Sequence, residues 1–144
     1  MASGILITAI SSGSGKTAAA CALMAAYQAQ NKKVSSCKCG PDYIDPMFHK
    51  EVLGVDSKNL DLFFSSEDEL RKEYAKHAAD AELVITEGVM GYYDGMRLDS
   101  VTASSYDVAR TLDIPAVLIL PCKGAALSLC AVVSGIVSFQ KDSN

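Results

Sequence analysis

Short segments of strand length alternate along this chain with segments of helical composition, and this alternation limits the fold more than any other feature. We predict strands over 4–10, 32–38, 82–88 and 115–120, and helices over 17–30, 66–80, 104–112 and 125–139. The strands are mostly unbroken apolar runs, which is typical of a parallel sheet covered by helices on both faces. At 144 residues the chain is about one domain long. The sequence therefore predicts a single α/β domain.

Two of the helices carry clear local signals. The segment 17–30 is rich in alanine and contains neither glycine nor proline. In the segment 66–80, Ser66 and Glu69 have the spacing of a capping box, and apolar residues recur every four positions from Leu70. Both segments are expected to be helices that pack one face on the sheet.

The last predicted helix, 125–139, is apolar around nearly its whole circumference. Such a helix is expected to be buried on all sides, yet only five residues follow it. Either it is a central helix packed on the sheet, or the chain is the front part of a longer protein. We favour the second interpretation and expect an incomplete domain.

A phosphate-binding turn is predicted where the sequence AISSGSGKT, from Ala9 to Thr17, joins the first strand to the first helix. Small residues let backbone N–H groups form an anion-binding nest, and the helix N-terminus adds unpaired donors. Lys16 would reach the β- and γ-phosphates of a bound nucleotide, and Thr17 would bind Mg²⁺. The full P-loop pattern has glycine where this chain has Ile10, so a flexible turn that only caps the helix is the alternative. The expected nucleotide-binding residues are Ser12, Gly13, Ser14, Gly15, Lys16 and Thr17.

Charged residues follow two of the other strands, at the sheet edge where parallel sheets bind ligands. Glu87 ends the segment 82–88 and is expected to hold Mg²⁺ directly or through water. Lys38 ends the second strand and would add positive charge to the phosphate site. Asp42, in the following loop, would lie near the same Mg²⁺. The expected catalytic residues are Lys16, Lys38, Asp42 and Glu87, and the expected metal ligands are Thr17, Asp42 and Glu87.

Composition argues against several other classes of function. A net charge of −4 disfavours nucleic acid as the main partner, because phosphate backbones are bound by basic surfaces. No apolar run reaches the roughly 18–20 residues that span a bilayer, and no leader pattern opens the chain. Five cysteines within apolar segments indicate reduced, buried thiols in a cytoplasmic protein. Cys37 and Cys39 are not followed by a second ligand pair, so no zinc-type site is expected there.

Four sequence motifs together resemble the cobyrinate a,c-diamide synthases. They are SSGSGKT, the segment K-x-GPDYIDPxFH from Lys38 to His49, NLD from Asn59 to Asp61, and EGVMGYYDG from Glu87 to Gly95. The resemblance covers nearly the whole chain, and GPDYIDPxFH is its most specific element. The family consists of glutamine-dependent amidotransferases of corrinoid biosynthesis, related to dethiobiotin synthetase and cobyric acid synthase. It implies a P-loop NTPase-type parallel sheet.

The resemblance also implies a reaction. ATP phosphorylates a side-chain carboxylate of cobyrinic acid, and ammonia released from glutamine then displaces phosphate from the acyl phosphate. Residues 1–144 would be the N-terminal ATP-binding synthetase domain, and a glutaminase domain or subunit would supply ammonia. The chain alone is expected to bind ATP weakly and to make no diamide from glutamine. Whether it forms a homo-oligomer is left open.

Within the resemblance, the segment 40–49 is expected to be a rigid loop, stiffened by Pro41 and Pro46. It would carry Asp42 to the metal and turn other side chains toward the corrinoid. The residues expected to face this substrate are Tyr43, Asp45, His49, Tyr93 and Asp94. His49 is alternatively a structural hydrogen-bonding residue, and the segment 93–95 an ordinary Asp-Gly turn. Thr102 and Ser104 would either donate to a substrate carboxylate or cap a helix.

The chain departs from the family pattern at Ala9 and Ile10, where relatives commonly have Gly-Thr, and only loosely follows it over 101–109. Three alternatives stay open. The first is an amidoligase that acts on another tetrapyrrole. The second is a partition-type P-loop ATPase, although the segment 10–14 lacks the additional lysine usual in those proteins. The third is an interaction module that docks through its apolar last helix.

Overall fold

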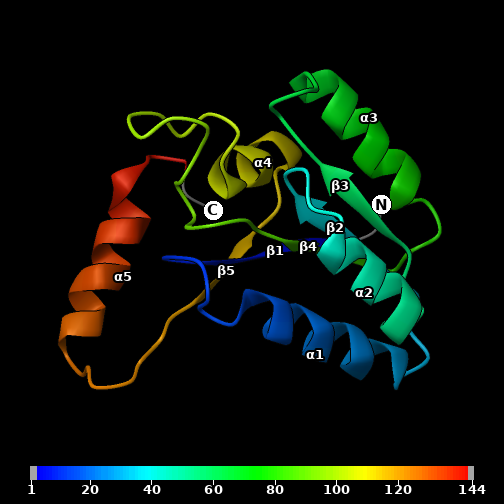
Figure 1. Ribbon diagram of the computed structural model, residues 1–144, viewed down its shortest axis with the longest axis horizontal. Coiled ribbons are helices and arrows are strands. Elements are labelled where there is room, and N and C mark those ends of the chain that lie inside the picture. The colour runs from blue at the N-terminus through cyan, green and yellow to red at the C-terminus, as the bar shows by residue number, and fades with distance from the viewer. Residues whose placement is uncertain (1–2, 143–144) are drawn as a thin grey trace.

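The computed structural model describes residues 3–142 and contains a five-stranded parallel sheet with the order β3-β2-β4-β1-β5 (Figure 1). The strands are β1 (Ser3–Ala9), β2 (Val34–Cys39), β3 (Ser57–Leu60), β4 (Leu83–Glu87) and β5 (Ala116–Ile119). The helices are α1 (Lys16–Gln28), α2 (Ile44–Leu53), α3 (Glu67–His77), α4 (Ser105–Leu112) and α5 (Ser128–Phe139). The predicted α/β class is confirmed.

Two apolar clusters fill the space on the two faces of the sheet. Alternate strand residues point to opposite faces, so Leu6 and Val84 belong to one cluster and Ile7 and Ile85 to the other. Helices α3 and α4 cover the first face, and α1 and α2 cover the second (Figure 1). Burial on both faces explains why β1 and β4, at the centre of the sheet, are largely apolar without alternation.

The expected loop over 40–49 is wrong in its second half, because residues from Ile44 onward form α2. Pro46 is the third residue of this helix, in the first turn, where a backbone N–H has no partner within the helix. Asp42 Oδ1 accepts hydrogen bonds from the N–H groups of Ile44, at 2.9 Å, and of Asp45, at 3.3 Å. These bonds satisfy the free donors at the start of α2 and fix where it begins.

Strand β3 is also absent from the sequence prediction. It is four residues long, has the polar sequence SKNL, and pairs only with β2 at the edge of the sheet. A short polar edge strand lacks the apolar pattern that marks the central strands. The capping box of α3 is confirmed, since Ser66 and Glu69 bond reciprocally.

Helix α5 is exposed, contrary to the expected burial. None of its residues is buried, and Val137 and Phe139 are 59% and 63% exposed. A long segment after β5 leads α5 away from the sheet, and Figure 1 shows it set apart at the left. The Tyr93 hydroxyl donates to the Ile136 carbonyl at 2.6 Å, which ties α5 to the turn after β4. Between Ser3 and Asp142 no helix has the length and apolar character needed to cross a membrane.

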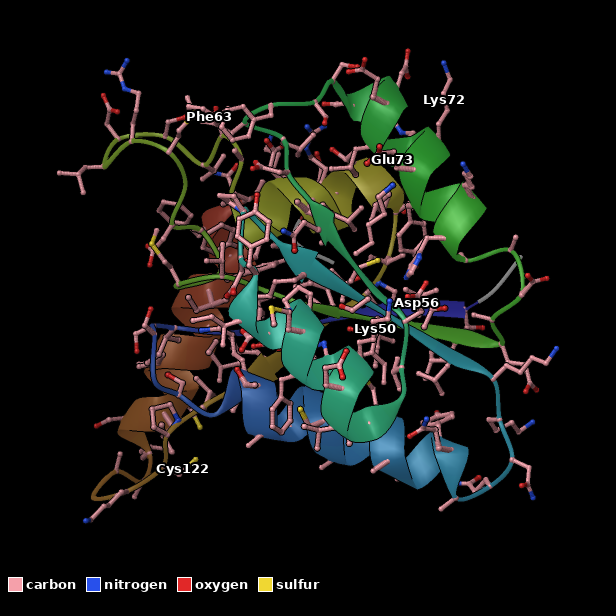
Figure 2. All side chains as sticks on the ribbon, turned by 45° about the vertical axis from the view of Figure 1, so that its right-hand side comes forward. Lys50, Asp56, Phe63, Lys72, Glu73 and Cys122 are labelled. Carbon is pink, nitrogen blue, oxygen red and sulfur yellow. The ribbon has the colours of Figure 1, made fainter. Side chains whose placement is uncertain are left out.

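The five cysteines are all free, as expected for reduced thiols. Cys37 and Cys39 are buried in the cluster beneath α3 and α4. The expected burial is wrong for Cys122 and Cys130, which are exposed. Figure 2 shows Cys122 at the outer edge of the molecule, on the segment that leads to α5.

Candidate functional site

The turn between β1 and α1 has the backbone geometry of a phosphate-binding loop. Gly13 and Gly15 have φ angles of 74° and 93°, in the left-handed region that favours glycine. Apart from the adjacent residues, no described part of the chain lies within 4 Å of a Cβ built at either position, so backbone conformation rather than space requires glycine there. Helix α1 has no side-chain cap and no acidic residue in its first turn. Its N-terminal N–H groups therefore remain available to an anion.

Lys16, the first residue of α1, is buried and folded back under this turn. Its ammonium donates to the carbonyl of Ser11 at 3.0 Å and to that of Met90 at 2.6 Å. Burial lowers the pKa of Lys16, and the nearby Lys38 ammonium lowers it further. The segment after β4 packs closely on the turn, since a Cβ at Gly91 would lie 2.7 Å from the Ile10 carbonyl oxygen.

Glu87, at the end of β4, contacts side chains of both α1 and β2. Its side chain is 1% exposed. Oε1 accepts hydrogen bonds from the Thr17 hydroxyl at 2.5 Å and from the Lys38 ammonium at 2.9 Å. Lys38 and Glu87 are paired in the register of β2 and β4, so the parallel sheet places them side by side. The structure thus brings Thr17, Lys38 and Glu87 together, as predicted from the sequence.

Lys38 lies among three carboxylates. Its ammonium is 2.6 Å from Asp45 Oδ2, 2.9 Å from Glu87 Oε1 and 3.8 Å from Asp42 Oδ2. Burial alone would lower the pKa of Lys38, but its hydrogen bonds to Asp45 and Glu87 outweigh burial and raise it. Burial would raise the pKa of Asp45, and the bond from Lys38 overcomes that effect and lowers it. We infer that Lys38 is charged and compensates buried negative charge.

Asp42 and Asp45 differ from their expected roles. Asp42 is beside the cluster, but Oδ1 caps α2 and only Oδ2 faces Lys38. Asp45, expected to face the substrate, binds Lys38 instead. The reason is the unpredicted helix: in the first turn of α2, Asp45 points toward the sheet, whereas Tyr43, one residue before the helix, is 75% exposed.

His49, also expected to face the substrate, is fully buried between α2 and the sheet. Nδ1 is 2.8 Å from the Ser36 hydroxyl, and Nε2 is 3.6 Å from Glu87 Oε2. Burial lowers the pKa of His49, and the negative charge of Glu87 only partly offsets it. The structure therefore places His49 inside the fold, behind Glu87, rather than on a surface that a substrate would face. The four-residue spacing of Asp45 and His49 could have revealed this inward face, had the segment been predicted as helix.

The segment after β4 forms a turn on which Asp94 is exposed. Asp94 Oδ2 accepts a hydrogen bond from the Gly91 N–H at 2.8 Å. The Tyr93 hydroxyl, expected to face the substrate, donates to a carbonyl of α5 in this structure. Ser104 is buried, and its hydroxyl accepts from the Asp107 N–H at 3.2 Å, which makes it the cap of α4. Thr102 is paired with Ser100 through their hydroxyl groups, 2.8 Å apart.

Two open hollows flank Tyr43 at this edge of the sheet. One, of about 400 Å³, is lined by Cys39, Gly40, Pro41, Asp42, Tyr43, Ile44 and Val89. The other, of about 300 Å³, is lined by Asp42, Tyr43, Pro46, Met47, Lys50, Ser57, Lys58 and Asn59. Phe63, 54% exposed, stands on the loop after β3 (Figure 2). Its ring makes an edge contact with that of Phe64, with centroids 4.5 Å apart. Exposed Tyr43, Ile44 and Met47 thus border the charged cluster, because they line the same hollows as Asp42.

The oxygen atoms beside the phosphate turn suit Mg²⁺. The Thr17 hydroxyl and Glu87 Oε1 are hard oxygen donors that lie side by side, and Glu87 Oε2, behind them, is buried with no hydrogen-bond partner among residues 3–142. Over residues 3–142, no group of three or more His, Cys, Asp or Glu side chains could hold a metal ion unaided. A Mg²⁺ ion at this point would take most of its ligands from phosphate oxygens and water.

Comparison with known proteins gives a consistent result. A family model described as the CobQ/CobB/MinD/ParA nucleotide binding domain matches residues 5–125. The chain is 41% identical to a cobyrinate a,c-diamide synthase of Synechococcus over 136 residues, or 94% of this chain. It is 40% identical to that of Clostridium tetani over 137 residues and 37% identical to that of Picrophilus torridus over 137 residues, in each case 95% of this chain. It spans about 30% of the length of these relatives.

Proposed function

The chain belongs to the CobQ/CobB/MinD/ParA nucleotide-binding domain family, and from this premise we propose that it binds ATP and Mg²⁺ to activate a carboxylate of cobyrinic acid. It would be the ATP-binding synthetase domain of a glutamine-dependent a,c-diamide synthase. The observation that carries the proposal is the contact of Thr17 and Lys38 with one buried carboxylate, Glu87, beside an uncapped helix N-terminus.

The phosphate turn and two lysines would bind the triphosphate. Residues 12–17 offer backbone donors, and Lys16 would exchange the carbonyl groups of Ser11 and Met90 for phosphate oxygens. This exchange is favourable because hydrogen bonds between charged groups are stronger than those to neutral carbonyls. Lys38 would supply a second positive charge near the γ-phosphate.

Thr17 and Glu87 would hold Mg²⁺, with Asp42 contributing through Oδ2. The ion would neutralise charge on the β- and γ-phosphates. Asp45 would position Lys38, because their 2.6 Å contact holds the ammonium at the centre of the cluster.

The corrinoid would bind over Tyr43 and the two hollows that flank it, with Tyr93 and Asp94 shaping the neighbouring turn. A substrate carboxylate oxygen would attack the γ-phosphorus of ATP, and ADP would leave. Ammonia would then attack the acyl carbon of the acyl phosphate, and inorganic phosphate would leave as the amide forms. The ammonia would come from glutamine through a glutaminase domain or subunit. The free thiols fit a cytoplasmic location.

The similarity to cobyrinate a,c-diamide synthases favours this function over a partition-type ATPase. The segment 10–14 also lacks the additional lysine expected of such an ATPase.

Calorimetry of ATP with Mg²⁺ tests the nucleotide site. We expect weak binding to the wild-type chain, lost in Lys16→Ala and kept in Lys72→Ala, whose residue lies on α3 away from the site (Figure 2). Addition of cobyrinic acid with free ammonia should then produce ADP. Equal binding by the two variants, or ADP formation independent of cobyrinic acid, would contradict the proposal.

A further inference from the structure

A buried polar pair lies directly behind the candidate metal-binding oxygen. His49 and Glu87 are 0% and 1% exposed, and His49 Nε2 lies 3.6 Å from Glu87 Oε2. Neither atom has a hydrogen-bond partner among the residues that the structure describes. Glu87 Oε1, in contrast, accepts from both Thr17 and Lys38. The two oxygens of one carboxylate therefore face two different environments.

A short chain of hydroxyl groups fixes the orientation of the imidazole. His49 Nδ1 lies 2.8 Å from the Ser36 hydroxyl oxygen and 3.4 Å from that of Ser57. The Ser57 hydroxyl donates to Ser36 at 3.2 Å, so the Ser36 hydroxyl is the group that can donate its own proton to Nδ1. Nδ1 then accepts, so the ring hydrogen is on Nε2. This tautomer turns an N–H group toward Glu87 Oε2.

We propose that His49 is a positioning residue that holds the Glu87 carboxylate against Thr17 and so tunes the affinity for the Mg²⁺–nucleotide complex. This inference rests on the proposed function, in which Glu87 serves Mg²⁺. The 3.6 Å between His49 Nε2 and Glu87 Oε2 is longer than an ordinary hydrogen bond. The Nε2–H group acts instead by attracting the buried Glu87 carboxylate electrostatically and so keeping it in its observed position. Outer groups of this kind orient metal-binding carboxylates, and their loss typically lowers metal affinity about tenfold to a hundredfold.

Two substitutions separate this role from simple packing. His49→Gln keeps an amide N–H near the place of Nε2, whereas His49→Asn keeps a polar group near Ser36 but ends short of Glu87. The measurement is the Mg²⁺ concentration that gives half-maximal binding of ATP, together with ATP binding in the absence of Mg²⁺. His49→Asn should raise that concentration by about tenfold or more, with no change without Mg²⁺, and His49→Gln should restore most of the wild-type value. The inference would be overturned if the half-maximal Mg²⁺ concentration were the same for the wild-type chain and both variants. It would also be overturned if the two variants lost Mg²⁺-dependent binding only in proportion to their loss of Tm.

Nitrogen NMR of the wild-type chain tests the contact without any ligand. The His49 ring should have its hydrogen on Nε2, and Glu87→Gln should shift the Nε2 resonance. A hydrogen on Nδ1, or an unchanged resonance, would overturn the inference even if nucleotide binds as proposed. Wild-type protein that shows the expected resonance but no Mg²⁺-dependent binding would overturn the proposed function, and with it the role of His49 in that function.

Discussion

Replacing Lys38 with methionine should destabilise the chain more than any exposed charge substitution. Methionine has a similar length but no charge, so Glu87 would lose the ammonium at 2.9 Å while remaining almost fully buried. Removing one partner of a buried ion pair costs about 3–5 kcal/mol, because the other charge stays buried without compensation. Asp45 adds less to this cost, since its side chain is 21% exposed and water can solvate it.

Urea unfolding followed by circular dichroism measures the free energy of unfolding of the variant and of the wild-type chain. In thermal unfolding, the same loss of stability corresponds to a fall on the order of 10 °C in Tm. The double variant Lys38→Met with Glu87→Gln also removes the uncompensated negative charge of Glu87, so it should recover most of the lost stability. Lys32→Met is the matched control, because Lys32 pairs with Glu82 where both side chains are about half exposed. A Lys38→Met variant as stable as this control, or a double variant no better than the single one, would refute a compensating role for Lys38.

Three further substitutions test other parts of the structure. Tyr74→Phe removes a buried hydroxyl that has no hydrogen-bond partner among the described residues 3–142, so stability at neutral pH should be equal or higher. Burial raises the pKa of Tyr74 to about 12 from 10.0, so the folded state loses stability as pH rises from about 10 toward 12. Between pH 10 and 12, the Tm of Tyr74→Phe should therefore fall less than that of the wild-type chain. Part of the fall remains, because the buried Cys37 and Cys39 thiols also have raised pKa values. A fall in Tm equal to that of the wild-type chain would contradict the role given to Tyr74. Gly91→Ala places a Cβ 2.7 Å from the Ile10 carbonyl oxygen, which is too close for the turn to keep its shape. The Tm and the affinity for ATP should therefore both fall. A Tm equal to that of the wild-type chain would show that the turn can move to make room. Tyr93→Phe removes the hydrogen bond to the Ile136 carbonyl, so amide hydrogen exchange should become faster over 128–139 but not in β4. Exchange over 128–139 at the wild-type rate would show that α5 is held by other contacts.

The parts of the fold that follow from local pattern were predictable. Apolar strands buried on both faces, the alanine-rich α1 and the capping box of α3 each depend on neighbours in sequence. The convergence of Thr17, Lys38 and Glu87 was predictable too, because parallel strands bring their carboxyl ends to one edge.

What could not be predicted depends on contacts between distant segments. Proline and glycine around Tyr43 suggest a loop, but Asp42 caps the segment that follows and Pro46 fits within a first helical turn. Once that helix forms, Asp45 and His49 turn inward to Lys38 and Glu87 instead of outward to a ligand. The exposure of α5 likewise reflects the path of the chain after β5, about which its apolar sequence says nothing.

The resting place of Lys16 links the phosphate turn to a distant part of the molecule. Met90 has a φ of 50°, and its carbonyl receives the Lys16 ammonium. An anion that draws this ammonium away leaves the Met90 carbonyl without its partner, three residues before the tyrosine that anchors α5. One short peptide segment, from Met90 to Tyr93, thus contacts both the lysine of the phosphate turn and the outermost helix.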